Sequence, residues 1–96
     1  MKNMGIIDQW TGIDGDVHYQ VDVELQESYA PTGSHVLTHV LHVKAVDHVT
    51  HQMATNQYIV LTPPERIDGR MRYSESDCHG IAKVIKETIE SAKING

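Results

Sequence analysis

Apolar and polar residues alternate along residues 17–25, the most regular pattern in the chain. Every second side chain from Val17 to Leu25 is apolar, and the positions between them, such as His18 and Asp22, are polar. A period of two places the apolar side chains on one face of a β-strand. The segment therefore predicts a strand with one buried face and one face in water.

A turn sequence precedes this strand. Asp14-Gly15 is typical of a type I′ hairpin turn, in which both central residues have positive φ. Pairing across this turn sets Trp10 opposite Tyr19 and places Ile6 on the same apolar face.

A second turn follows. Residues 30–33 (Ala-Pro-Thr-Gly) fit a type I turn with proline at its second position. A three-residue loop then sets Asp22 opposite His42 and Val23 opposite Leu41, which joins acid to base and apolar to apolar.

Residues 35–46 predict a third strand, rich in β-branched residues. Leu41 and Val43 lie on one of its faces, and Val40 and Val46 lie on the other. A strand that is apolar on both faces is usually covered on both. Because one helix covers one face, we expect a second copy of the chain to cover the other.

The remaining sequence predicts short strands and a polar connection. Residues 57–62 indicate a strand that ends before Pro63-Pro64, and residues 65–75 form a polar segment with a turn at Asp68-Gly69. A short strand is expected at residues 71–73.

The C-terminal segment predicts an α-helix. Ser74 or Ser76 is expected to cap it, with Asp77 in the first turn opposing the helix dipole. Five residues then form one stripe at helical spacing, which is expected to pack on the sheet: Ile81, Ile85, Thr88, Ile89 and Ala92.

These elements predict an α+β fold, a four- or five-stranded antiparallel β-meander with one C-terminal helix packed on one face. A chain of 96 residues with 40% hydrophobic and 22% charged residues suits one compact domain over residues 1–96. A single cysteine excludes an internal disulfide. Because the sequence has no signal-peptide pattern and no apolar run of transmembrane length, a cytoplasmic location without membrane contact is expected.

The net charge of −5 comes entirely from residues 1–62, which contain seven acidic residues and only two basic ones, Lys2 and Lys44. The sequence therefore offers no direct evidence for nucleic-acid binding. Asp22 and Glu24 belong to an acidic face that either meets a basic partner or is simply solvated.

Five of the seven histidines lie between His35 and His51, so this part of the chain is histidine-rich and its charge is expected to depend on pH. In a helix, His35, His39 and His42 would share one face and could bind zinc, nickel or copper. In the strand that the composition favours, His42 points away from the other two. The alternative to a metal site is a set of packed or hydrogen-bonded histidines.

Arg66, Arg70 and Arg72 form the only basic concentration, directly before the helix. Together with the helix N-terminus they are candidates for holding a phosphate or carboxylate. The alternative is charge balance with the acidic residues around them in the sequence: Glu65, Asp68, Glu75 and Asp77.

Cys78 is expected in the first helical turn, where a thiol can gain thiolate character. With His79 or another histidine as base it would suit a thiol enzyme or a redox sensor. The alternative is a packing residue, because neighbouring helical side chains such as those of Cys78 and His79 point in different directions.

The sequence carries no recognised catalytic constellation, and it favours a small non-catalytic interaction or regulatory module. The expected partners are a second copy, bound through residues 35–46, and a further protein of unknown identity. A histidine-based metal binder and a thiol-dependent protein acting through Cys78 remain the alternatives.

Overall fold

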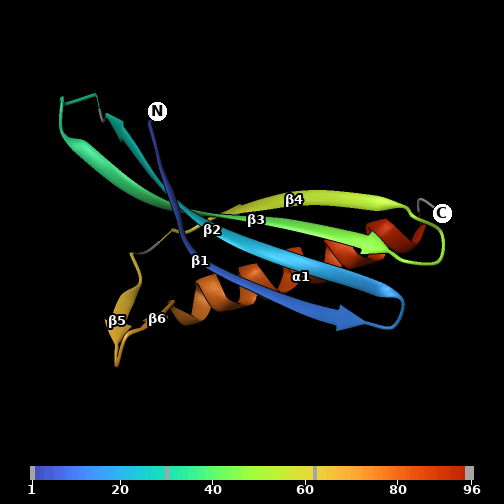
Figure 1. The fold of residues 1–96 in the computed structure, drawn as a ribbon. Helices are drawn as coiled ribbons and strands as arrows, with labels where there is room; N and C mark the ends of the chain where they lie inside the picture. The colour runs from blue at the N-terminus through green and yellow to red at the C-terminus, as the bar shows by residue number, and fades with distance from the viewer. Residues whose placement is uncertain (1, 30, 62, 95–96) are drawn as a thin grey trace.

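The structure, a computed structural model, describes residues 2–29, 31–61 and 63–94. Four strands form an antiparallel sheet in chain order, two shorter strands form a separate hairpin, and a helix completes the fold. The elements are β1 (Lys2–Asp14), β2 (Val17–Tyr29), β3 (His35–Asp47), β4 (Met53–Ile59), β5 (Glu65–Ile67), β6 (Arg70–Arg72) and α1 (Glu75–Ile94). Figure 1 shows the helix lying along one face of the sheet, which confirms the predicted α+β fold.

The pairing of β2 with β3 has the predicted register. Asp22 lies opposite His42 and Val23 lies opposite Leu41. The paired strands reach farther toward the turn than the alternating pattern indicated, since Tyr29 still pairs with His35.

The register of β1 against β2 differs from the prediction by two residues. The turn residues are Gly15 and Asp16, so Asp14 pairs with Val17, and Trp10 lies opposite Val21. Gly15 has a φ of 59°, whereas Asp14 is in strand conformation, so the type I′ turn at Asp14-Gly15 was a wrong prediction. A shift of two keeps Trp10 on the predicted face, because the side-chain period of a strand is two.

Irregularities in β1 overturn the placement of Ile6. The register shifts between Asn3 and Ile6 and again between Ile6 and Asp8, and Gly5 has a φ of 98°. Ile6 consequently lies opposite Glu24, among the polar side chains, and is 58% exposed. Bulges of this kind twist an edge strand and re-aim its side chains.

The core lies between α1 and the sheet. The predicted helical stripe is confirmed, because Ile81, Thr88, Ile89 and Ala92 are buried and Ile85 is half-buried. One cluster joins Ile81 to strand residues near the middle of the sheet: Val21, Val23, Leu41 and Val43. A second cluster joins Ile89 and Ala92 to Val17 and Ala45.

The N-terminus of α1 is closed by side chains of the chain itself. Ser74 is the cap: its Oγ accepts the Asp77 N–H (3.2 Å), and its hydroxyl donates to Asp77 Oδ2 (2.9 Å). The fully buried Asp77 carboxylate also accepts the Tyr58 hydroxyl (2.6 Å) and the Leu61 N–H (3.1 Å). Ser74 and Asp77 thus cap the first turn of α1 and tie it to the end of β4.

Tyr58 lies between β4 and the helix. Its ring packs over Gly80, where an added Cβ would lie 2.3 Å from the ring. The hydrogen bond to Asp77, burial and the charge of Asp77 together raise the pKa of Tyr58 to about 12.

β3 is an interior strand, paired with β2 along its length and with β4 over residues 40–46. On the face away from α1, Val40 is only 4% exposed and Val46 is half-buried, whereas Val36 is 43% exposed. Since the chain itself buries Val40, the two apolar faces of this strand do not alone require a partner.

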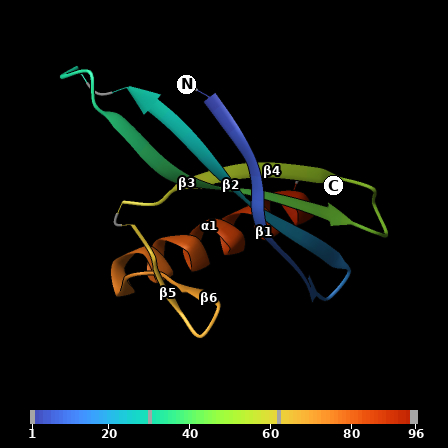
Figure 2. The ribbon, with the colours of Figure 1, turned by 60° about the vertical axis from the view of Figure 1, so that its left-hand side comes forward.

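The β5–β6 hairpin turns at Asp68 and Gly69, which both have positive φ, 52° and 77°, as the sequence predicted. Met71 and Tyr73 pack against the main core cluster. The hairpin lies next to the N-terminal end of α1 (Figure 1), on the helix side of the sheet (Figure 2).

Candidate functional site

The face of the sheet opposite α1 is open and carries linked polar side chains. Asp22 Oδ1 accepts the side-chain amides of Gln9 (2.6 Å) and Gln20 (3.0 Å). The three residues come from β1 and β2, so the carboxylate joins two strands across this face. Both hydrogen bonds lie on the exposed surface of the sheet, and they fix the position of the Asp22 carboxylate.

His42 contacts Glu24 and not Asp22, which lies directly opposite. The His42 Nε2 atom is 3.2 Å from Glu24 Oε2, and Glu24 Oε1 accepts the Gln26 side-chain amide at 2.7 Å. The same Nε2 atom is buried and has no aligned hydrogen-bond partner among the described residues. We therefore interpret the contact as an ion pair that forms when the imidazole is protonated.

The predicted metal ligands do not converge. His39 and His42 lie on opposite faces of β3, and the side chain of His35 lies outside the described part of the structure. Across residues 2–29, 31–61 and 63–94, no group of three histidine, cysteine, aspartate or glutamate side chains is placed to hold a metal ion. Burial, followed by the charge of Arg66, lowers the pKa of His39.

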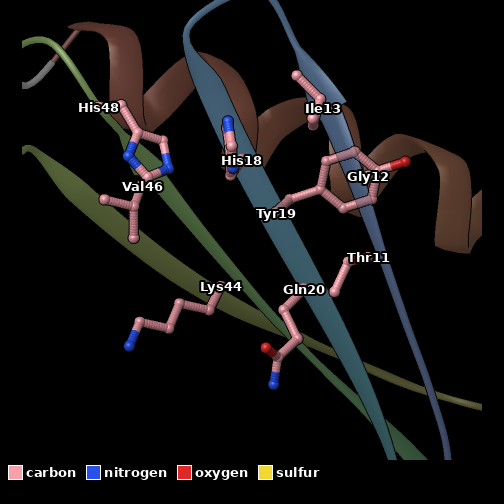
Figure 3. A pocket seen from close by; sticks show the side chains of 9 residues that line it. All are labelled: Thr11, Gly12, Ile13, His18, Tyr19, Gln20, Lys44, Val46 and His48. Atoms are coloured by element: carbon pink, nitrogen blue, oxygen red, sulfur yellow. The ribbon is translucent and has the colours of Figure 1, made fainter.

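Another pair of histidines does meet. The rings of His18 and His48 are 3.8 Å apart between centroids, with 61° between their planes. They lie at a surface pocket of about 440 Å³ near the β1–β2 turn (Figure 3), together with Thr11, Gly12, Ile13, Tyr19, Gln20, Lys44 and Val46. Sequence reasoning did not single out this pair, because the two residues are close only once β2 and β3 are in register.

His48 and His51 belong to the turn between β3 and β4. The Asp47 carboxylate accepts the N–H groups of Val49 (2.8 Å) and Thr50 (3.1 Å), and these bonds are the main cause that lowers the pKa of Asp47. The His48 N–H donates to Asp16 O (2.9 Å), which ties this turn to the β1–β2 turn. The backbone and Asp47 thus hold His48 beside His18.

Cys78 is exposed in the first turn of α1, and its Sγ lies 3.7 Å from Tyr73 O. The neighbouring His79 is directed toward Glu75, with 3.8 Å between Nε2 and Oε1. The thiol and this imidazole therefore have separate contacts.

Two of the three predicted arginines line a cleft of about 620 Å³ between β1 and the β5–β6 hairpin. Its lining consists of Ile7, Asp8, Trp10, Arg66, Gly69, Arg70 and Met71. Arg72 lies elsewhere, at a smaller hollow with Pro63, Glu65, Tyr73 and Ser74. The sequence did not predict that Trp10 belongs to this site. No residue near Trp10 in the sequence indicates that the β5–β6 hairpin packs beside it.

No family model, curated protein or solved structure matches this chain. Within the described residues, no helix has both the length and the apolar character needed to cross a membrane.

Proposed function

We propose that the protein is a non-catalytic interaction module that binds a second copy of itself through the free edge of β4. The sequence suggested self-association through residues 35–46. Because residues 40–46 of β3 lie between β2 and β4, we move the interface one strand outward.

The observation that carries this proposal is the character of β4 as an edge strand. Edge strands are usually protected from pairing by charges, prolines or bulges. Residues 53–59 contain no charged residue and no proline, and their pairing with β3 has no register shift. The opposite edge, β1, has two such shifts.

The direction of the backbone groups supports pairing along this edge. The Val60 N–H donates to His39 O (3.0 Å) and so points toward β3. Since direction alternates along an antiparallel strand, the N–H groups of Thr55 and Gln57 point outward. The Gln57 N–H now donates to Asn56 Oδ1 (2.9 Å), a local bond that pairing would exchange for a backbone carbonyl.

The sequence of β4 is self-complementary about Asn56. In an antiparallel pair centred there, Met53 lies opposite Ile59 of the second copy, and Thr55 lies opposite Gln57. Met53 and Ile59 lie on the face away from α1 and are 53% and 51% exposed. At each end of the paired strands, Met53 of one copy and Ile59 of the other would cover each other. The polar residues Thr55 and Gln57 would be paired between these two ends.

Analytical ultracentrifugation tests the proposal. We expect a reversible dimer at micromolar concentrations and a monomer for Thr55→Pro, because proline removes an outward N–H while leaving the bonds to β3. Thr55→Ala is the matched control, and it should keep the dimer. A wild-type protein that sediments as a monomer up to about 1 mM, where even weak specific association is populated, would refute the proposal.

A further inference from the structure

The cleft between β1 and the β5–β6 hairpin combines two free cations with an aromatic side chain. Arg66 and Arg70 are exposed, and Trp10 is half-buried at the same cleft. Asp8 is the only carboxylate in its lining, so the cleft has a positive balance in a chain whose net charge is −5. This local sign differs from that of the chain as a whole.

The two guanidinium groups are not used by the fold. In the part of the chain that the structure describes, neither Arg66 nor Arg70 takes part in a salt bridge or a side-chain hydrogen bond. The nearby acidic residues Glu65, directly before Arg66, and Asp68, between the two arginines, therefore do not neutralise them by direct contact. After burial, the positive charge of Arg66 is the second cause that lowers the pKa of His39. The electrostatic effect of Arg66 therefore extends to strand β3.

The apolar side of the cleft is anchored. Trp10 and Met71 both pack against the main core cluster, one from β1 and the other from β6. The strand that carries Trp10 and the hairpin that carries both arginines are thus packed against the same hydrophobic core. Guanidinium groups bind carboxylate or phosphate through paired N–H donors, and an indole offers a flat surface for a ring to stack on.

The size and the surrounding charge favour a small ligand. A volume of about 620 Å³ lies within the range of small-molecule sites. A long polyanion such as RNA would meet the acidic surface of residues 1–62, whereas a small anion meets only the cleft.

We propose that this cleft binds a small planar anion, its ring stacked on Trp10 and its phosphate or carboxylate held by Arg66 and Arg70. This site is separate from the β4 edge, so it is independent of self-association.

Trp10 is the only tryptophan of the chain, and its fluorescence reports on the cleft directly. We would titrate the full chain with adenosine monophosphate, with adenosine and with inorganic phosphate, and repeat each titration by calorimetry. We expect saturable binding of the monophosphate with a change in Trp10 emission. Adenosine and phosphate alone should each bind at least about tenfold more weakly, because each lacks one of the two contacts.

Three variants with the same change of charge complete the test. Arg66→Gln and Arg70→Gln should each weaken binding of the monophosphate about tenfold. Arg72→Gln should leave it unchanged, because Arg72 lines a different hollow. Absence of binding by both methods, equal binding of adenosine, or equal weakening by Arg72→Gln would each overturn the proposal.

Discussion

Asp77 joins three parts of the chain through one buried carboxylate. It accepts hydrogen bonds from Tyr58 at β4, from Leu61 after β4, and from the helix cap Ser74. A buried carboxylate is stable only when donors surround it. These bonds therefore fix where α1 begins relative to the edge strand.

Tyr58→Phe should lower the free energy of unfolding by about 1.5–3 kcal/mol at pH 7, since it removes a donor to a buried charge. The pKa of Tyr58 is raised to about 12 in the folded protein, above the ordinary value of about 10. The stabilisation is therefore complete below about pH 10 and is lost as the pH rises toward 12.

Urea unfolding of the wild type and Tyr58→Phe at pH 7 and pH 11.5 measures this difference. Tyr19→Phe is the control, because its ring packs against the same core and its hydroxyl has no hydrogen-bond partner among the described residues. A gap between wild type and Tyr58→Phe that does not shrink at high pH would contradict the role of this bond.

Gly80→Ala should destabilise the protein even though alanine favours helices by about 1 kcal/mol. The added methyl group would collide with the Tyr58 ring, and overpacking of this kind costs about 1–3 kcal/mol. Thermal unfolding of the single variant and of Gly80→Ala combined with Tyr58→Leu separates the two effects. Without the ring, the same substitution should become stabilising; a stabilising effect beside the intact ring would refute the packing.

At the level of elements, local signals predicted most of the secondary structure and part of the pairing. The three-residue loop predicted from the proline-containing sequence gives the observed register of β2 and β3, because the loop length fixes which residues lie opposite each other. The first hairpin offered two turns around Gly15, Asp14-Gly15 and Gly15-Asp16, and the chain uses the second. Gly5, an isolated glycine within the strand, is a local signal for a bulge, but it does not indicate that the register shifts twice around Ile6.

The candidate sites were harder to predict than the elements. The arginines were visible in the sequence, but the place of Trp10 beside them depends on how the β5–β6 hairpin packs. The register of β2 and β3 was predicted correctly, with Asp22 opposite His42. The His42 side chain nevertheless contacts Glu24, the diagonal neighbour, and pairing across the strands does not predict this contact. Contacts between distant elements need a three-dimensional arrangement, which periodicity alone does not supply.

The β3–β4 turn depends on Asp47. Asp47→Ala should lower the free energy of unfolding at pH 7, because two backbone N–H groups lose their acceptor. The pKa of Asp47 is lowered in the folded state, so its contribution is present above about pH 4 and is lost as the pH falls through the folded value.

Urea unfolding at pH 7 and pH 2.5 checks this dependence. The difference between wild type and Asp47→Ala should be larger at pH 7 than at pH 2.5. Asp16→Ala, in the neighbouring turn, is the control, since it is the backbone carbonyl of Asp16 that bonds to His48. An equal difference at both pH values would show that the charge of Asp47 is not what holds the turn.

At the level of the whole molecule, the sheet has one face covered by α1, one open face and two unlike edges. The β1 edge is bulged, whereas the β4 edge is regular and uncharged. A regular edge of this kind is a template for another strand. Self-association at β4 would continue the sheet from one copy into the next and leave the arginine cleft free.

Amide hydrogen exchange at Thr55 tests this self-association most directly, since its N–H points out from the edge where the second copy would pair. As the protein is concentrated through the dissociation constant of the dimer, we predict that exchange of the Thr55 amide slows by about tenfold, in proportion to the falling share of monomer. A Thr55 amide that exchanges at the same fast rate at every concentration would contradict pairing at β4.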